Sequence, residues 1–464
     1  MGIITRVNRL SRRTLIKWQA DKHPHPIVVR GARQVGKSFL LERFAKENFK
    51  TAVIINFEYD FEFYEDFETL DPVHIVNQIY LKRNIEIKTG ESLIFLDEVQ
   101  LFPKAIQALR YFYEKMPGLH VIAAGSLVDF ALKQEPVSMP VGRVHYFYMH
   151  PLSFREFLEA QGLVGYLKFI DDLDFTKSTN ALRKALEIKP RITSLGNAVH
   201  EKLLAEVQKY LLLGGMPAVI REYLNSDKQF PLAFREQRQI LNTYIDDFRK
   251  YGKSSEFYYL RKSFERAPHL ISKKFKYSQL DPESKSTHLK QALEHLIDAH
   301  LFTKVRATSG IVTPLELNAS DSDFKIIGLD CGLVQNLLSA NNESLYVSDF
   351  SSGLITEQFV GQELRVYVDP YDLKKLYYWF NDAKNASAEI DYLIEVGKHI
   401  IPVEVKASHR GRLKSLRYFM DKYKAPLGIR ISANPLSFEE GILSVPFYAV
   451  SEINRLVEML FLKN

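Results

Sequence analysis

The chain has 464 residues, 46% of them hydrophobic and 25% charged, which is the composition of an ordinary globular protein with about three domains. Its single cysteine, Cys331, excludes an internal disulfide framework and a cysteine-rich zinc site, and it fits a reducing compartment. No apolar run approaches the ~18 residues of a membrane span, and the basic N-terminus is not a secretory signal. We therefore expect a cytoplasmic protein without a membrane partner. The formal net charge of +6 permits an anionic partner but does not demand one.

The most informative stretch follows a short apolar strand over residues 27–29. It is a glycine loop that leads into a helical pattern, with the residues Gly31, Ala32, Arg33, Gln34, Val35, Gly36, Lys37 and Ser38. The glycines let backbone N–H groups approach phosphates, and the helix N-terminus adds its positive end. Lys37 would reach the β- and γ-phosphates, and the Ser38 hydroxyl would hold Mg²⁺. The pattern predicts a binding site for ATP and Mg²⁺.

A second motif lies downstream, in the segment SLIFLDEVQ. Residues 93–96 form a continuous apolar run, which is typical of a parallel strand buried on both faces. Asp97 and Glu98 follow at the carboxyl end of this strand, where ligands bind in open α/β sheets. We expect Asp97 to hold the hydrated Mg²⁺ and Glu98 to activate the attacking water.

Three further positions have two interpretations each. The strand-like run HVIAA ends at Gly125 and Ser126, so Ser126 would sense the γ-phosphate, or the segment is a simple strand-to-helix turn. Arg143 and Arg155 would stabilise transition-state charge, or each has a surface or structural role. From the sequence alone these alternatives remain open.

Taken in order, GARQVGKS, LDEVQ, AAGS, the GR before HPLSFREF, and GGMPAV resemble the AAA-type ATPase family of bacteria and archaea that carries a restriction-endonuclease-like C-terminal domain. The resemblance runs along most of the chain. It implies that the loop lysine and serine are Walker A residues, that the two acids are the Walker B pair, and that Ser126 is the sensor. It also implies that residues 214–217 touch the nucleotide, although the sequence alone indicates only a helix breaker there.

The same resemblance and the local patterns give a domain division. Residues 1–152 are predicted to form the P-loop ATPase core, and residues 153–254, mostly helical in pattern, a lid that packs over the nucleotide. Residues 255–325 are predicted to form a winged helix, and residues 326–464 a nuclease-like domain.

The winged helix is inferred from a helical repeat in THLKQALEHLIDAHLF, which a β-like segment follows. Such a module either binds nucleic acid or serves as a plain connector. In the first case, phosphates would be contacted by three lysines, Lys273, Lys274 and Lys276.

Residues 388–408, AEIDYLIEVGKHIIPVEVKAS, are predicted to form a hairpin around a two-residue Gly-Lys turn. That turn places Asp391 opposite Glu404, with Lys406 on the same face of the sheet. Two carboxylates and a lysine would hold Mg²⁺ beside a base or water-orienting group. The alternative is a half-exposed strand with a salt bridge between Glu404 and Lys406.

The hairpin resembles the PD-(D/E)xK nuclease fold, in which Asp391, Glu404 and Lys406 would match the three motif residues. Glu357, on the preceding helical segment, would match an acid that such nucleases often add. The YYWF stretch before the hairpin and a Ser-Leu pair after it also fit. The sequence departs from the motif at Ile390, where proline is expected, but the carboxylate stays in place.

The sequence therefore predicts an α/β protein: a P-loop NTPase core of the AAA type with a helical lid, a winged helix and a restriction-endonuclease-like domain. The predicted function is Mg²⁺-dependent ATP hydrolysis, with Lys37 and Glu98 as catalytic residues. Nucleotide state would control the C-terminal domain, which cleaves or binds DNA or RNA, with Lys406 as its catalytic lysine. The alternative is a non-catalytic nucleotide-dependent switch whose C-terminal domain only binds a partner. The oligomeric state is left open.

Overall fold

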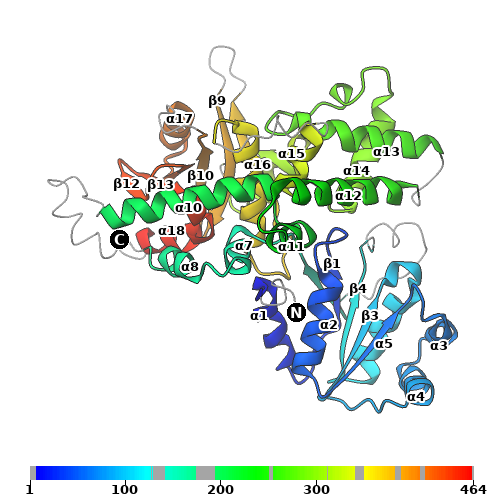
Figure 1. The fold of residues 1–464 in the computed structure, drawn as a ribbon. Helices are drawn as coiled ribbons and strands as arrows, with labels where there is room; N and C mark the ends of the chain where they lie inside the picture. Colours follow the sequence, from blue (N-terminus) through cyan, green and yellow to red (C-terminus); the bar gives the residue numbers. More distant parts are fainter. Residues whose placement is uncertain are drawn as a thin grey trace.

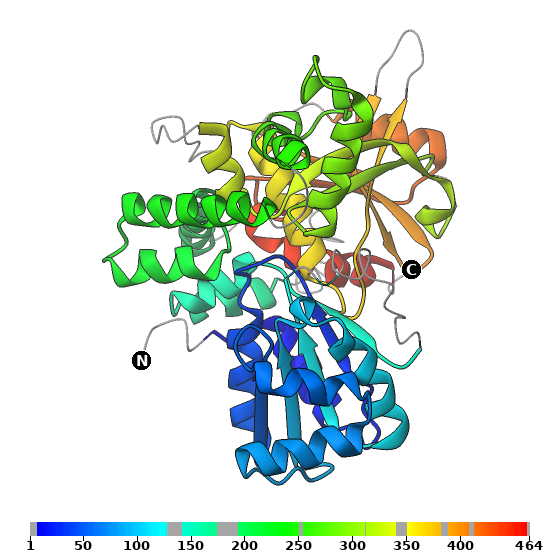
Figure 2. The same ribbon diagram turned by 90° about the vertical axis from the view of Figure 1, so that its right-hand side faces the viewer.

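A five-stranded sheet with the strand order β2-β3-β4-β1-β5 forms the N-terminal core, at the bottom of Figure 2. The computed structural model describes residues 7–126, 128, 142–173, 194–249, 254–310, 312–339, 350–381, 388–407 and 413–461. Neighbouring strands of the core sheet all run parallel. The strands are β1 (Ile27–Arg30), β2 (Thr51–Asn56), β3 (Ser92–Asp97), β4 (His120–Ala124) and β5 (His145–Tyr148).

Helices cover both faces of this sheet. Leu15 and Phe44 pack on the face that Phe95 presents, whereas Phe112 packs on the face that Ile94 presents. Every residue of β3 is buried, as the continuous apolar run predicts. The helices are α1 (Leu10–Gln19), α2 (Lys37–Asn48), α3 (Tyr64–Glu68), α4 (Pro72–Arg83) and α5 (Lys104–Lys115).

A group of helices follows the core, and α10, α11 and α12 are drawn in green in Figure 1. Ser153 begins this group with a capping box, because its side chain accepts from Glu156 N while the Glu156 side chain accepts from Ser153 N. The helices are α7 (Phe154–Ala160), α8 (Val164–Asp171), α10 (Ser194–Leu213), α11 (Pro217–Asn225), α12 (Phe230–Phe248), α13 (Ser254–Arg266) and α14 (Ser286–Asp298).

The remaining strands form one mixed sheet in the order β12-β13-β11-β10-β9-β8-β6-β7. Phe359 of α16 packs in the core on one face, and Phe419 of α17 packs on the other. The strands are β6 (Phe302–Thr308), β7 (Ala319–Gly328), β8 (Leu376–Asn381), β9 (Ala388–Val396), β10 (His399–Val405), β11 (Gly428–Ser432), β12 (Ser437–Glu439) and β13 (Ile442–Pro446). The helices are α15 (Cys331–Ser339), α16 (Gly353–Val366), α17 (Lys414–Tyr423) and α18 (Ile453–Phe461).

The hairpin of β6 and β7 differs from the expected wing of a winged helix. Its strands pair with each other, but β6 also pairs in parallel with β8, with Val305 opposite Leu376. The hairpin is therefore the edge of the eight-stranded sheet and not a separate wing. The sheet crosses the boundary that we placed between residues 325 and 326, because its pairing joins segments far apart in the sequence. The domain division stays a prediction.

The hairpin of β9 and β10 has the predicted register. Val396 lies opposite His399 and Tyr392 opposite Val403, which is the pairing that a two-residue turn at Gly397 requires. In the described part of the chain, no single helix is long and apolar enough to cross a membrane. The helices α10 and α11 reach that length and hydropathy only together, as a pair bent by 116°.

Candidate functional site

The glycine loop has the backbone geometry of a phosphate cradle. Gly31 and Gly36 have φ values of +141° and +92°, in the region that glycine adopts without strain. A Cβ atom on Gly31 would lie 2.2 Å from the Met149 carbonyl oxygen, so no larger residue fits there. The helix α2 begins at Lys37, directly after the loop, and its first N–H groups have no intrahelical partner. These N–H groups are free to bind an anion.

Lys37 lies at the centre of this loop. Its Nζ donates to the carbonyl oxygens of Gly31 and Ala32, at 2.9 Å each. Burial lowers the pKa of Lys37 to about 8, while the charges of Glu98 and Asp97 act in the opposite direction. The ammonium group is thus desolvated and held where phosphate oxygens would replace the two carbonyls.

Asp97 ends β3 and Glu98 follows it, and the charges of both act on Lys37 in the loop. Burial raises the pKa of the Asp97 carboxylate, while the neighbouring Ser38 hydroxyl acts in the opposite direction. Glu98 adopts a left-handed backbone with φ of +52° and accepts a hydrogen bond from the Gln100 amide. A hydroxyl and a carboxylate are oxygen ligands of the kind that Mg²⁺ prefers. Ser38 and Asp97 therefore fit the predicted metal role.

Ser126 is buried at the carboxyl end of β4, on the same edge of the sheet. Gly125 packs against Gln100, since a Cβ on Gly125 would lie 2.2 Å from the Gln100 Oε1 atom. Gln100 in turn donates to Glu98. The structure thus places Ser126 next to the residues that hold the proposed water-activating carboxylate, and its role as a sensor stays a prediction.

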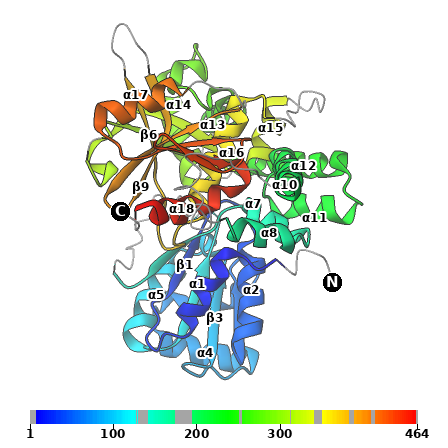
Figure 3. The same cartoon turned by 90° about the vertical axis from the view of Figure 1, so that its left-hand side faces the viewer.

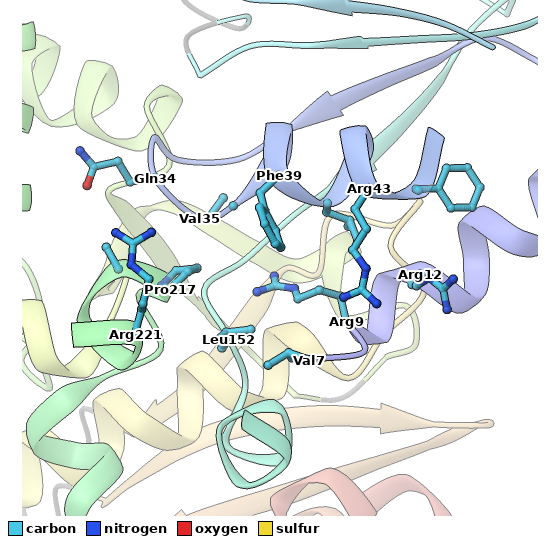
Figure 4. A pocket seen from close by; sticks show the side chains of 14 residues that line it. Val7, Arg9, Arg12, Gln34, Val35, Phe39, Arg43, Leu152, Pro217 and Arg221 are labelled. Atoms are coloured by element: carbon cyan, nitrogen blue, oxygen red, sulfur yellow. The ribbon is translucent and has the colours of Figure 1, made fainter. Parts of the chain in front are cut away.

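A cavity of about 390 Å³ opens beside the loop (Figure 4). Gln34, Val35 and Gly36 of the loop form part of its wall, and Phe39 from α2 exposes 50% of its surface there. The helix α11 contributes Pro217, Ala218 and Arg221, and the N-terminal segment contributes Val7, Arg9 and Arg12. Outside the loop, Pro217 is the wall residue that the sequence analysis predicts, through the Gly/Pro element at residues 214–217. The arginines of the wall were missed.

The glycine loop also contacts α12 through Arg33. Arg33 Nη1 lies 2.6 Å and 2.5 Å from the two carboxylate oxygens of Asp247. The Tyr244 hydroxyl donates to the Arg33 carbonyl oxygen at 2.8 Å. One helix therefore holds this loop residue by both its side chain and its backbone.

The two other arginines considered from the sequence make ion pairs with the chain itself. Arg143 Nε lies 3.1 Å from Glu114. Arg155 lies 2.5 Å from Asp171 and 3.1 Å from Glu452. These contacts favour the surface and structural interpretations.

The predicted residues of the C-terminal hairpin lie in a buried cluster of charges. Asp391 accepts from Val405 N at 2.8 Å, and Glu404 pairs with the Lys406 ammonium group. Burial raises the pKa of both carboxylates, and nearby Glu357 raises them further. The second oxygen of Glu404 is buried and has no hydrogen-bond partner among the described residues. The pair of Glu404 and Lys406 is also the salt bridge of the alternative interpretation, so the nuclease site stays a prediction.

One member of this cluster was not predicted. Lys325 on β7 is 1% exposed, and its Nζ lies 3.0 Å from Glu357 and 2.5 Å from Glu389. Its charge also acts on Asp391 and Glu404. In the described ranges, no group of three or more His, Cys, Asp or Glu side chains is arranged to hold a metal ion. The acids of this cluster are instead neutralised in part by lysine, so metal binding here stays a prediction.

The family model of an AAA domain matches residues 23–158, which include the loop and both acids. This segment is therefore an AAA-type P-loop domain, as predicted. Models of two domains of unknown function, DUF8612 and DUF4143, match residues 204–344 and 352–450. No curated protein matches the chain.

Two solved structures are similar at low identity. The Holliday junction branch migration motor RuvB of Thermotoga maritima is 12% identical, with 65% of this chain and 93% of that chain covered and a TM-score of 0.29. The Aeropyrum pernix ORC2 protein in ADPNP-ADP complexes is 11% identical, with 73% and 92% covered and a TM-score of 0.29. These TM-scores are too low to support any statement about this chain.

Proposed function

We propose that this protein binds ATP with Mg²⁺ and hydrolyses it, and that its nucleotide state controls the C-terminal domain. The position of Lys37 supports the proposal most directly. Its desolvated ammonium group lies inside a loop of backbone N–H groups, with Ser38 and Asp97 beside it. Positive charge, free N–H donors and oxygen ligands in one place are what a nucleoside triphosphate with its metal requires.

The residues of the site have separate tasks in this proposal. Lys37 neutralises charge on the β- and γ-phosphates, while Ser38 and Asp97 would hold Mg²⁺, which when bound stabilises the leaving phosphate. Glu98 accepts a proton from the attacking water, and Gln100 fixes its orientation through their hydrogen bond. The cavity beside the loop would take the base and the ribose, because Phe39 offers an apolar surface there.

The proposed control of the C-terminal domain depends on hydrogen bonds that link the turn before α11 to the residue just after β7. Gly215 accepts from Leu152 N at 2.7 Å and donates to Asp330 Oδ2 at 2.6 Å. Gly215 lies two residues before Pro217, which lines the cavity, and Asp330 lies just beyond β7, which carries Lys325. A movement of α11 on nucleotide binding would reach the C-terminal sheet through these contacts.

The C-terminal cluster supports two roles for its domain. Asp391, Glu404 and Lys406 converge as a nuclease site requires, and the partnerless oxygen of Glu404 favours cleavage of DNA or RNA with Mg²⁺. The alternative is a switch that holds its nucleotide and only binds a partner. Lys325 favours that alternative, because its ammonium group already neutralises acids of the cluster. A cytoplasmic location belongs to both versions of the proposal.

ATP binding by calorimetry and ATP turnover, measured together, test the proposal. Lys37→Ala should lose most of its affinity for ATP, because the charge in the loop is removed. Glu98→Gln should bind ATP as the parent does but turn it over ~10² times more slowly, the usual loss for a positioned base. A parent that binds ATP without turnover would support the switch. An affinity that Lys37→Ala leaves unchanged would contradict the nucleotide site itself.

A further inference from the structure

A second cavity, of about 340 Å³, lies where the N-terminal core meets the C-terminal domain. Its walls come from the start of α1, the end of β5 and the segment that follows α16. In Figure 3 the chain that leaves α16 reaches down to the core beside α1. Tyr148 N donates to the Pro370 carbonyl oxygen at 2.8 Å and fixes this approach.

Arg365, in the wall of this cavity, is a buried cation without a counter-ion. It is 5% exposed, its Nε atom is buried without a hydrogen-bond partner, and no described acid lies within ion-pair distance. Burial alone accounts for the lowering of its pKa to about 10, with no carboxylate acting against it. Burying an unpaired charge is costly, so such a group indicates a ligand of opposite charge.

The start of α1 presents further donors to the same cavity. Ser11 is 8% exposed, and its hydroxyl has no partner among the residues that the structure describes. The helix has ten residues, its N-cap Arg9 makes no capping hydrogen bond, and its first turn contains no acid. The positive end of the helix is instead capped from outside, because the Glu156 carboxylate accepts from Leu10 N at 2.9 Å. A hydroxyl and a guanidinium group therefore line one space.

The acids on this cavity do not pair with Arg365, and Glu156 caps the first N–H group of α1. Glu156 accepts from Leu10 N at 2.9 Å and from Ser153 N at 2.8 Å, and it lies 3.2 Å from Arg9. Asp369 is exposed at the rim and accepts from Tyr371 N at 3.1 Å, and Asp372 is exposed beside it. Neither aspartate acts on Arg365.

His150 also lines the cavity, and its pKa is held well below the usual value by burial and by Arg365, His300 and Arg9. At neutral pH it adds hydrogen-bonding capacity without adding charge.

We propose that this cavity binds a small phosphate-bearing molecule, either inorganic phosphate or a phosphate monoester, with Arg365 and Ser11 as its principal ligands. The planar guanidinium fork matches two phosphate oxygens, and the partnerless Ser11 hydroxyl can donate to another. The volume is in the range of small-molecule sites, at roughly 300 Å³ and above. Because the walls belong to both the core and the C-terminal domain, the bound anion would hold the two together. The site is separate from the nucleotide loop, although Arg9 borders both cavities.

Thermal unfolding and calorimetry of the full chain with inorganic phosphate test this site, in the presence of excess ADP and Mg²⁺ to occupy the loop. Phosphate should stabilise the parent. Arg365→Met should melt at a higher temperature than the parent without phosphate, because an uncompensated buried charge is removed. It should lose the stabilisation by phosphate and bind phosphate at least ~10-fold more weakly. Arg235→Met, at an exposed position of α12, removes the same charge and should respond as the parent does.

Ser11→Ala provides an independent test if Arg365→Met does not fold. It should weaken phosphate binding by about two- to tenfold, as expected for one lost hydrogen bond. The proposal is overturned if phosphate does not stabilise the parent, or if it stabilises Arg365→Met equally. A short single-stranded DNA added in place of phosphate distinguishes the source of the anion. If binding that depends on Arg365 occurs with DNA but not with phosphate, the small-molecule assignment is wrong.

Discussion

Replacing Asp247 with asparagine should loosen the phosphate loop, because Arg33 depends on that carboxylate for its position. Both carboxylate oxygens lie within 2.6 Å of Arg33 Nη1. Asparagine keeps the size of the side chain but removes the charge and one acceptor. We therefore expect a less ordered loop, which would bind ATP more weakly and would lower the free energy of unfolding.

The expected magnitude follows from the exposure of the two side chains. The Asp247 side chain is 8% exposed, whereas that of Arg33 is 35% exposed, so water screens the pair in part. Exposed pairs contribute up to about 1 kcal/mol, and breaking a fully buried pair costs about 3–5 kcal/mol. We expect a coupling energy of about 1–2 kcal/mol between the two side chains. If all of it appears in ATP binding, the dissociation constant rises about 5- to 30-fold.

A double-mutant cycle with Arg33→Met and Asp247→Asn measures this coupling, by urea unfolding and by calorimetry with ATP. Asp246→Asn is the matched control, since Asp246 is exposed on the same turn of α12 and should change neither quantity. Tyr244→Phe removes only the hydrogen bond to the Arg33 carbonyl oxygen and should cost about 1 kcal/mol. If the two single substitutions add to within about 0.3 kcal/mol, the side chains do not act together and the reasoning is refuted.

Two further predictions concern the C-terminal domain. Burial raises the pKa of Glu363 from 4.5 to about 8, so between these pH values the unfolded chain releases a proton that the native state keeps. The free energy of unfolding should therefore fall as pH rises through this range. Measured by urea unfolding, it should fall less steeply with pH in Glu363→Gln than in the parent. An equally steep fall in both would contradict the raised pKa of Glu363. Asp391→Asn should melt slightly higher than the parent in chelator, since facing like charges cost up to about 1 kcal/mol, and should lose any stabilisation by Mg²⁺. If Mg²⁺ does not shift the melting of the parent, the hairpin is only a salt-bridged strand.

The features that could be predicted from the sequence are the ones that short stretches determine. The loop from Gly31 to Ser38 lies between its own strand and helix, and Asp97 ends a strand of the same sheet. The register of β9 and β10 follows from a turn of two residues, which leaves only one way to pair the flanking strands. In both cases a few neighbouring residues determine the local backbone geometry.

The features that were missed depend on contacts between distant segments. The wing was expected to be separate because nothing in residues 302–328 reveals that β6 pairs with β8. Lys325 reads as one polar residue in the run FKII, and its partner Glu357 lies 32 residues away on another element. Arg365 resembles any basic residue near a helix end, and only the fold buries it. The sequence shows which side chains are polar, but the tertiary packing determines which groups each of them contacts.

The same packing explains why nucleotide state would reach the C-terminal sheet. Gly214 has φ of +70°, and a Cβ there would lie 1.9 Å from Asp330 Oδ1, so the turn before α11 must lie directly against this carboxylate. Burial raises the pKa of Asp330 to about 6, while hydrogen bonds from Gly215 N and Leu333 N favour its charged form. A shift of α11 would have to carry Asp330 with it or break the hydrogen bond to Gly215. In the first case the end of β7 moves with Asp330, and β7 is the strand that holds Lys325 against the acidic cluster; in the second case the two parts are uncoupled.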